Sequence, residues 1–331
     1  MSLRRNIDVE RLRAHHRLMH RIRAFEEQAL RGLEEKVVLG AIHPSIGQEA
    51  IAAGICSNLA REDILLSTHR GHGHTLAKGA DPLAMMRELF GREGGNCGGK
   101  GGSMHIADFS VGMLGANGVV AANISIAAGA AHAIKLKKED RIVCCIFGDG
   151  AINRGPFLEG LNWAKVFNLP VLFVCEDNGF AASTRTEDMT AGEGPVARAE
   201  GIGVPAHDVD GNDVLALEAL TLELKEAIRA GAGPQFLRAR TYRLTGHTGA
   251  DPATYRPKEE VEERWKQDPI IRAAEMLRQA GVAEAELEAD REAAKAEMLA
   301  AYEKAVATPY PPAERAFHDV QDIGDPRVEA Y

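Results

Sequence analysis

Two short apolar segments, separated by a helical pattern, restrict the fold of this chain more than any other feature of its sequence. Residues 141–147 (RIVCCIF) and 171–175 (VLFVC) each have the length and composition of one buried strand. Residues 156–167 between them read as a helix. A strand, a helix and a strand within roughly thirty residues predict a βαβ unit, whose right-handed crossover makes the two strands parallel. The sequence therefore predicts an α/β fold with a twisted parallel sheet and helices on both faces.

The rest of the chain fits around this unit. Apolar residues at spacings of three and four begin at Leu18 and predict an amphipathic N-terminal helix. Helices are predicted at residues 47–59 and at 81–90, where Asp81 is the N-cap. Further predictions are a glycine-rich loop at residues 91–103, a later strand at 236–239, outer helices beyond 257 and an extended tail at 309–312. We expect one domain over residues 1–331, with an N-terminal helix and a C-terminal helical extension.

Composition excludes several classes of protein. The formal net charge is −9 over 331 residues, which disfavours a nucleic-acid partner because phosphate binding requires a basic surface. No apolar stretch is long enough to span a bilayer. Five cysteines without a repeating frame are typical of a reducing compartment, so a cytoplasmic location is predicted. The arginines near the N-terminus (Arg4, Arg5, Arg11, Arg13, Arg17, Arg21 and Arg23) predict a solvated or partner-facing helix.

Polar residues follow each of the two central strands. The first strand ends in Gly148-Asp149-Gly150, and the second is followed by Glu176-Asp177-Asn178-Gly179. Because the carboxyl ends of parallel strands meet at one edge of a sheet, Asp149 and Asn178 should face the same crevice. A carboxylate and an amide oxygen are ligands that suit Mg²⁺, and the helix that starts near Pro156 should turn its positive end toward this region. The pattern predicts a diphosphate held through a metal ion.

At these residues the chain resembles the alpha subunits of the thiamine-diphosphate-dependent first component of 2-oxo acid dehydrogenase complexes. The resemblance covers roughly residues 15 to 310. It is carried by Gly148-Asp149-Gly150-Ala151, by Asp177-Asn178, and by the strings at residues 67–74 (STHRGHGH), 99–105 (GKGGSMH) and 115–120 (GANGVV). Within the family these strings look most like acetoin dehydrogenase and then pyruvate dehydrogenase.

The resemblance implies a role for individual residues. Asp149, Asn178 and the carbonyl of Phe180 would bind Mg²⁺, while Arg70 and the backbone of Gly148, Gly150 and Ala151 would hold the diphosphate. Gly118 and Val120 would offer backbone groups to the aminopyrimidine ring. His43 would lie near the reactive carbon of the cofactor, and His247 would lie on a loop that becomes ordered around it; both are expected to be catalytic. The nearby His69, His72 and His74 could suggest zinc, but no fourth ligand is evident and structural roles are favoured.

The implied activity is oxidative cleavage or decarboxylation of acetoin or a small, pyruvate-like 2-oxo acid, with transfer of the acyl group to a lipoyl carrier. The implied partners are a beta subunit, in a heterotetramer of two alpha and two beta chains, and a lipoyl acyltransferase. A glutamate that activates the aminopyrimidine would come from the beta subunit, and the small residues of 127–135 are a candidate contact surface. The chain departs from the family pattern at Ala121-Ala122, Arg154, Asp177 and Arg185.

Other classes fit less well. Residues 94–100 match most of a phosphate-loop motif, but Gly101 stands where the motif requires Ser or Thr. Residues 208–212 (DVDGN) resemble the start of a calcium loop, yet the glycine falls too early, so a simple turn before a helix is predicted. A non-catalytic paralogue with the same fold remains the alternative, which the presence of Arg70, Asp149 and Asn178 disfavours.

Overall fold

All six strands of the main sheet are parallel, which confirms the predicted fold class. The computed structural model describes residues 8–38 and 40–318. In spatial order the strands are β2 (Met113–Asn117), β1 (Ile64–Thr68), β3 (Val143–Gly148), β4 (Val171–Asp177), β8 (Gln235–Arg240) and β7 (Ala206–Asp210). The two segments that suggested the fold, β3 and β4, are neighbours at the centre of the sheet.

Alternation along the central strands builds a hydrophobic core on each face of the sheet. Cys144 and Ile146 of β3 join one buried cluster, whereas Val143, Cys145 and Phe147 join the other. Successive side chains of a strand point to opposite faces, so a strand that is apolar at every position must be covered on both sides. This explains the uninterrupted apolar runs in the sequence.

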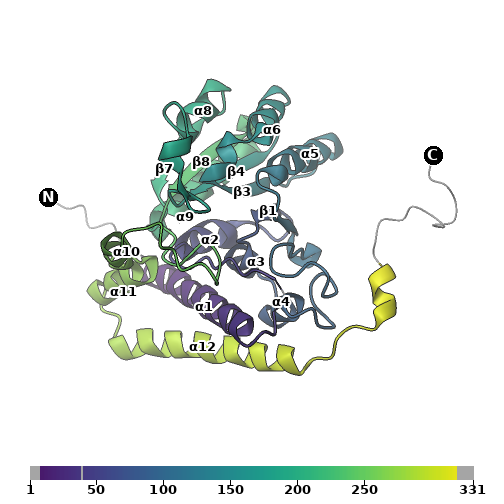
Figure 1. Cartoon of the computed structure of the whole chain (residues 1–331). Helices are drawn as coiled ribbons and strands as arrows, with labels where there is room; N and C mark the ends of the chain where they lie inside the picture. The colour runs from purple at the N-terminus through teal and green to yellow at the C-terminus, as the bar shows by residue number, and fades with distance from the viewer. Residues whose placement is uncertain (1–7, 39, 319–331) are drawn as a thin grey trace.

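Different helices cover the two faces (Figure 1). On one side lie α5 (Ala122–Lys137), α6 (Gly155–Val166) and α8 (Pro195–Gly201). On the other lie α1 (Val9–Glu34), α2 (Glu49–Ile55), α3 (His72–Ala77), α4 (Pro82–Leu89) and α9 (Val214–Ala227). The remaining short elements are η1 (Cys56–Asn58), η2 (Phe109–Val111), η3 (Asp149–Asn153), β5 (Phe180–Ala181), β6 (Thr184–Arg185), α7 (Thr186–Met189) and η4 (Ile228–Ala232).

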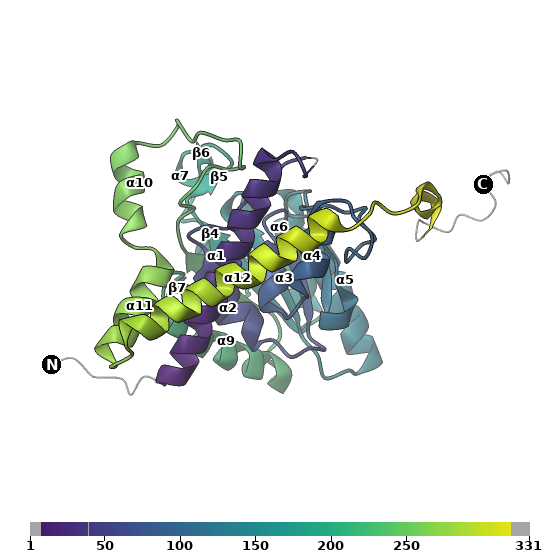
Figure 2. The same ribbon diagram turned by 90° about the horizontal axis from the view of Figure 1, so that it is seen from below.

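The C-terminal part adds an outer layer of helices. It comprises α10 (Lys258–Trp265), α11 (Pro269–Gln279), α12 (Glu284–Ala307) and the short η5 (Ala313–Phe317). Seen from below, α12 runs across α1 (Figure 2). Arg13 and Arg17 of α1 pair with Asp290 at 2.8 and 2.9 Å, and Arg21 pairs with Glu297 at 2.7 Å.

The prediction of a solvated or partner-facing arginine cluster is therefore wrong for α1. Arg13, Arg17 and Arg21 contact acidic residues of the chain's own α12, more than 270 positions away. Arg11 pairs with Glu218 of α9, and Arg23 pairs with Glu49 and Asp268. A sequence does not reveal such a partner because the acidic residues of α12 look equally solvated. Arg4 and Arg5 lie outside the described residues.

Most predicted elements are present, with shifted ends. Helix α4 is confirmed, and the Asp81 carboxylate caps it by accepting from Leu83 N and Ala84 N at 3.3 and 3.2 Å. The β5–β6 hairpin was not predicted, and neither were three strands of the main sheet, namely the short β1, β2 and β7. The last of these shows that the prediction of a simple turn at residues 208–212 is wrong in part, because its first three residues belong to an edge strand. Its half-exposed, acidic sequence AHDVD lacks the apolar run of a central strand.

Two smaller findings concern membranes and thiols. Within the described part of the chain, none of the helices combines the length and the apolar character needed to cross a bilayer. Cys144, Cys145 and Cys175 are 0% exposed in the core of the sheet, where they pack as small apolar side chains.

Close contact between α5 and α6 depends on Gly160. A Cβ at this position would lie 2.7 Å from Ile124 Cγ2 and 3.1 Å from the Ile124 carbonyl atoms. We expect Gly160→Ala to lower the free energy of unfolding by about 1–3 kcal/mol, the usual effect of overpacking, in a chemical denaturation experiment.

The matched control is Gly129→Ala on α5. A Cβ there meets nothing within 4 Å, so the substitution should leave stability unchanged or raise it by up to about 1 kcal/mol. Equal stability of the two variants would contradict the proposed close contact.

Candidate active site

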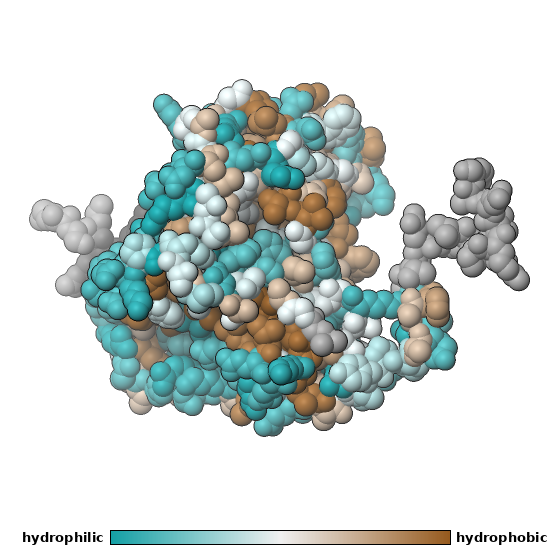
Figure 3. Space-filling view, viewed as in Figure 1, coloured by the Kyte–Doolittle hydropathy of each residue, from teal (hydrophilic) through white to brown (hydrophobic). Residues whose placement is uncertain are grey.

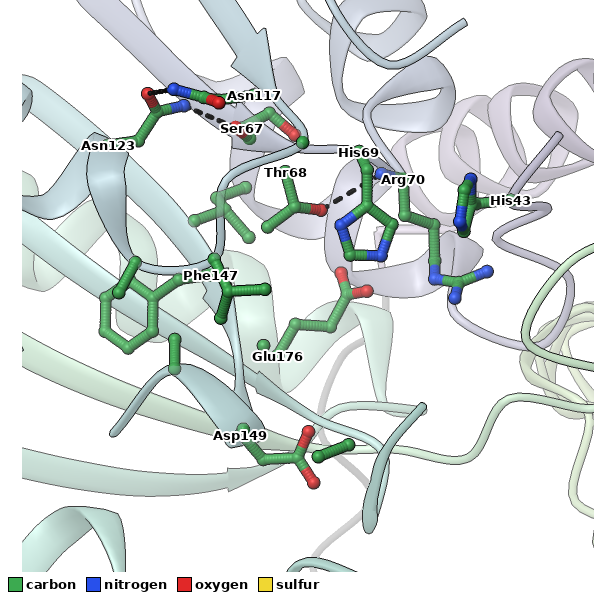
Figure 4. A pocket seen from close by; sticks show the side chains of 18 of the residues that line it. His43, Ser67, Thr68, His69, Arg70, Asn117, Asn123, Phe147, Asp149 and Glu176 are labelled. Carbon is green, nitrogen blue, oxygen red and sulfur yellow. Dashed lines mark hydrogen bonds between the residues drawn. The ribbon is translucent and has the colours of Figure 1, made fainter. Parts of the chain in front are cut away.

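A cavity of about 360 Å³ opens at the carboxyl edge of the sheet. Its walls are the ends of β1, β2, β3 and β4 and the loops that follow them. This is the edge at which parallel α/β sheets bind ligands, because loops from several strands converge there. Figure 4 shows His43 and Arg70 on one side of the cavity, Asp149 on another, and Glu176 between them.

The structure brings every residue that the sequence nominated to this cavity. The lining includes His43, Arg70, Gly118, Val120, Gly148, Asp149, Gly150, Ala151, Asn178, Phe180 and His247. These residues come from segments spread over about 200 positions, so their convergence is a property of the fold and not of local sequence. The cavity also contains residues that the sequence did not nominate, among them Glu176, Arg243 and His69.

The register of β3 and β4 brings Asp149 and Asn178 to the same edge. Gly148 pairs with Glu176 across the two strands, so each polar residue follows directly after its strand. Both side chains are buried, at 2% and 7% exposure. Asp149 accepts a hydrogen bond from Thr186 Oγ1, and the amide oxygen of Asn178 accepts from Phe180 N at 3.1 Å.

Among residues 8–38 and 40–318, Asp149 forms no ion pair with a positively charged side chain. Burial, followed by the charge of the adjacent Asp177, raises its pKa well above the ordinary value. A divalent cation beside Asp149 would offset both effects, and the donors at hand are a carboxylate, an amide oxygen and the carbonyl of Phe180. These are hard oxygen ligands, so they fit a magnesium ion.

A chain of buried hydrogen bonds fixes the Asn178 side chain. Its Nδ2 donates to Gln48 Oε1 at 2.8 Å, and Gln48 Nε2 donates to Glu176 Oε1 at 2.7 Å. Glu176 Oε2 faces His74 Nε2 at 3.0 Å, and His74 Nδ1 faces Ser67 Oγ at 2.8 Å. Because a carboxylate can only accept, Nε2 of His74 carries the ring proton and Nδ1 accepts from Ser67. The amide of Asn178 is thereby tied to β1 on the other side of β3.

Two buried guanidinium groups face the cavity without a carboxylate partner. Arg70 and Arg243 are 4% and 1% exposed. Arg70 donates to the carbonyls of Pro44 and His247, and Arg243 donates to Ala182 O at 2.9 Å and Tyr255 Oη at 2.8 Å. Within residues 8–38 and 40–318 neither forms an ion pair with an acid. Burial and the nearby Arg243 lower the pKa of Arg70 to about 10, so it remains charged at neutral pH. Buried unpaired cations favour an anionic ligand, and a diphosphate fits.

Three histidines lie together beside these arginines. The ring centroids of His43, His69 and His247 are 4.6 to 5.6 Å apart. Burial first, and then the charge of Arg70, lowers their pKa values to about 3, 2 and 4 respectively. Although their nitrogens lie within 4.8 Å of one another, Arg70 and Arg243 each approach His247 Nδ1 at 3.4 Å. This positive field disfavours a bound cation, so the cluster is better suited to an anionic ligand or to proton transfer.

The group His69, His72 and His74 divides into two parts. His72 bonds to Glu26 Oε2 at 2.8 Å and to Ser103 Oγ at 2.9 Å, and His74 belongs to the chain that holds Asn178. Their predicted structural roles are confirmed. His69 lines the cavity instead, and this placement was not anticipated.

The two glycines of the Gly-Asp-Gly turn act differently. A Cβ at Gly148 would meet nothing within 4 Å, so this position leaves open space at the cavity wall. A Cβ at Gly150 would lie 2.7 Å from Ala181 Cβ, so this glycine permits contact with the β5–β6 hairpin. The helix that starts at the cavity is η3 and not α6, whose first residues do not line it. The prediction about the helix near Pro156 is wrong in this respect.

Fold and cavity together define a class of protein: an α/β chain whose parallel sheet carries, at its carboxyl edge, a cavity lined by buried guanidinium groups and by oxygen donors. Comparison with known proteins identifies the family. The family model described as "Dehydrogenase E1 component" matches residues 17–314.

Curated relatives agree with this match. The alpha subunit of the acetoin:2,6-dichlorophenolindophenol oxidoreductase of Cupriavidus necator is 43% identical over 317 residues, 95% of each chain. Its counterpart from Bacillus subtilis is 44% identical over 76% of each chain. The pyruvate dehydrogenase E1 component alpha subunit of Zymomonas mobilis is 40% identical over 86% of this chain and 81% of its own. This chain belongs to the dehydrogenase E1 component family, which implies thiamine diphosphate as the cofactor.

The histidine cluster should remain neutral in mildly acidic solution. An unperturbed imidazole titrates at about 6.5. We expect ring NMR signals of His43, His69 and His247 to show no protonation down to about pH 5, because burial and Arg70 disfavour the charged form.

The same shifts have a consequence for stability. In the unfolded chain the three histidines bind protons near pH 6.5, whereas in the folded chain they do so only at lower pH. Their protonation therefore lowers the free energy of unfolding as the pH falls from about 6.5 toward the pKa values of the folded chain. Replacing Arg70 by Met should raise the three titration midpoints. Midpoints near 6.5 in the unmodified chain would show that the rings are not shielded as described.

Proposed function

We propose that this chain binds thiamine diphosphate through Mg²⁺ and serves as the alpha subunit of a two-chain enzyme. The enzyme cleaves or decarboxylates acetoin or a small 2-oxo acid oxidatively, and the acyl group passes to a lipoyl carrier. The observation that supports this most strongly is the cavity, in which two buried unpaired guanidiniums face the same space as a carboxylate that lacks a positive partner. The activity is supported by relatives named for acetoin and pyruvate, whose sequences align with 95% and 86% of this chain.

In this proposal, different residues of the cavity lining bind the cation and the phosphoryl groups. Asp149, Asn178 and the Phe180 carbonyl hold the cation, while Arg70 and the backbone of Gly150 bind the phosphoryl groups. When bound, thiamine diphosphate supplies the carbanion stabilisation that bond cleavage next to a carbonyl requires. The neutral rings of His43 and His247 are able to accept or donate a proton at the cavity wall.

The cavity is open where the aminopyrimidine would lie. Val119 and Val120 at its rim are 66% and 48% exposed. The two acids that line it, Asp149 and Glu176, are engaged by Thr186 and by Gln48 and His74. Neither is free to activate the ring, which supports a glutamate from a beta subunit.

Helices α5 and α6 also expose apolar residues that suit such a partner. The exposed apolar residues of α5 and α6 are Ile126, Leu136, Leu158, Trp163 and Val166, with Phe167 just beyond. Brown side chains appear on this side of the molecule in Figure 3. The small residues of 127–135 contribute less than expected, because Ala127, Ala128 and Ala131 are buried against the chain's own core. We therefore propose α6 and the ends of α5 as the beta-subunit surface, within a two-alpha, two-beta assembly that acts in the cytoplasm with a lipoyl acyltransferase.

A non-catalytic paralogue is the alternative. It would keep the fold but would be under no constraint to keep the cavity. The charged and polar residues expected of a working site line one space here, which favours the enzyme.

Removing the predicted cation ligand should abolish cofactor binding. Asp149→Ala is expected to weaken Mg²⁺-dependent binding of thiamine diphosphate by about 100-fold or more in calorimetry, because the cation loses its charged ligand. Asp140→Ala is the control: its side chain is 90% exposed just before β3, and binding should not change. Unchanged binding by Asp149→Ala would place the metal elsewhere.

Turnover should require a second chain. The purified chain alone should reduce 2,6-dichlorophenolindophenol very slowly with acetoin, pyruvate or branched 2-oxo acids, and adding a beta-type subunit should restore the rate. The reconstituted Asp149→Ala chain is the inactive control. Full activity of the single chain would defeat the two-chain proposal, and the preferred ketone in the panel would identify the substrate.

A further inference from the structure

Asp177 lies beside the proposed cation site but does not face the cavity. It ends β4, between Glu176 and Asn178, and is 8% exposed. Both of those neighbours line the cavity, whereas Asp177 lines a separate groove together with Asp149, Arg185, Thr186 and Arg238. The chain thus carries an additional buried carboxylate next to the cation site, directed to the other side of the metal-binding loop.

Arg238 on β8 holds this carboxylate in the groove. Its Nε donates to Asp177 Oδ2 at 2.7 Å, and Gly179 N donates to the other carboxylate oxygen at 3.1 Å. A second nitrogen of Arg238 donates to Asp208 on β7 at 3.2 Å. The guanidinium is therefore positioned from both sides, on a strand whose backbone pairs with β4.

The charge of Asp177 is close enough to affect the site, because Asp177 lines the same groove as Asp149 and directly precedes Asn178 in the chain. If Asp177 were free to turn, two carboxylates would compete for the same cation. Added negative charge strengthens attraction for a divalent cation but repels a diphosphate, so the two ligands would respond in opposite directions.

We propose that Arg238 is a positioning residue for the cofactor site: it retains Asp177 in the groove and balances its charge, so that Asp149, and not Asp177, is presented to the cation. This inference rests on the proposed function. It assigns Arg238 to diphosphate affinity and not to the chemistry of the reaction.

The test measures the two ligands separately on the full-length chain. Binding of Mn²⁺ alone, as a paramagnetic substitute for Mg²⁺, is followed by electron paramagnetic resonance, and binding of thiamine diphosphate at saturating Mg²⁺ by calorimetry. The variants are Arg238→Gln, Asp177→Asn, the double variant and Arg240→Gln. Arg240 is the matched control, because it lies two residues further along β8 and its side chain bonds to Asp208 at 2.5 Å. Its backbone pairs with Asp177, but among the described residues the side-chain partner of Asp177 is Arg238.

We expect Arg238→Gln to bind thiamine diphosphate roughly tenfold more weakly and Mn²⁺ as tightly as the unmodified chain or more tightly, because of the uncompensated charge. The double variant should recover diphosphate affinity to within about threefold, since the charge is then removed as well. Arg240→Gln should resemble the unmodified chain. A purely structural role predicts a parallel loss of both affinities that Asp177→Asn does not rescue, and that result would overturn the inference.

Asp149→Ala separates this inference from the function on which it depends. If Asp149→Ala abolishes Mg²⁺-dependent binding while Arg238→Gln has no effect, only the role of Arg238 fails. If Asp149→Ala binds normally, the proposed cation site itself fails.

Discussion

The parallel pairing of β3 with β4 is the constraint on which the site depends. Gly148 is opposite Glu176, so the polar residues that follow the two strands leave the sheet side by side. A slip of one residue would exchange the two faces of a strand. Here such a slip would move Phe147 out of one core and Ile146 out of the other. The apolar residues that fix the register thus also fix the distance between the proposed cation ligands.

The site places an unusual density of polar groups next to that core, and they are arranged in two ways. On the cation side the groups satisfy one another: Ser67, His74, Glu176, Gln48 and Asn178 form one continuous series of hydrogen bonds. On the anion side they do not, because the partners of Arg70 and Arg243 among the described residues are neutral: carbonyls, a phenol and the ring of His247. Satisfied networks hold a geometry, whereas unpaired buried charges favour a ligand. The difference separates positioning residues from binding residues within one cavity.

Local patterns in the sequence were enough to predict the central strands, their polar ends and the fold class. These patterns also identified residues that the fold brings to one cavity. The end of a strand can be recognised from local sequence, and in a parallel sheet all carboxyl ends lie at the same edge. Glu176 belongs to the polar segment after the second strand, and Arg243 lies four residues before His247. Nothing local indicates that Arg243 is buried without an acid or that Glu176 bonds to Gln48. The pairing of Arg238 with Asp177 spans 61 positions and depends on β8 lying next to β4. Such contacts follow from strand order, which the sequence alone leaves open.

The distribution of polar and apolar groups around the cavity explains why one chain would hold the cofactor and still need another. Charge suited to phosphoryl groups and a cation lies in the cavity, where burial strengthens each interaction. The rim at Val119 and Val120 is apolar and exposed, and further apolar residues are exposed on α6. Water that reaches such a rim would solvate a developing charge and weaken the electrostatic control of the walls. A second chain that covered the rim would exclude this water and bury the apolar residues of α6 at the same time, so closing the site and assembling the enzyme would be one event.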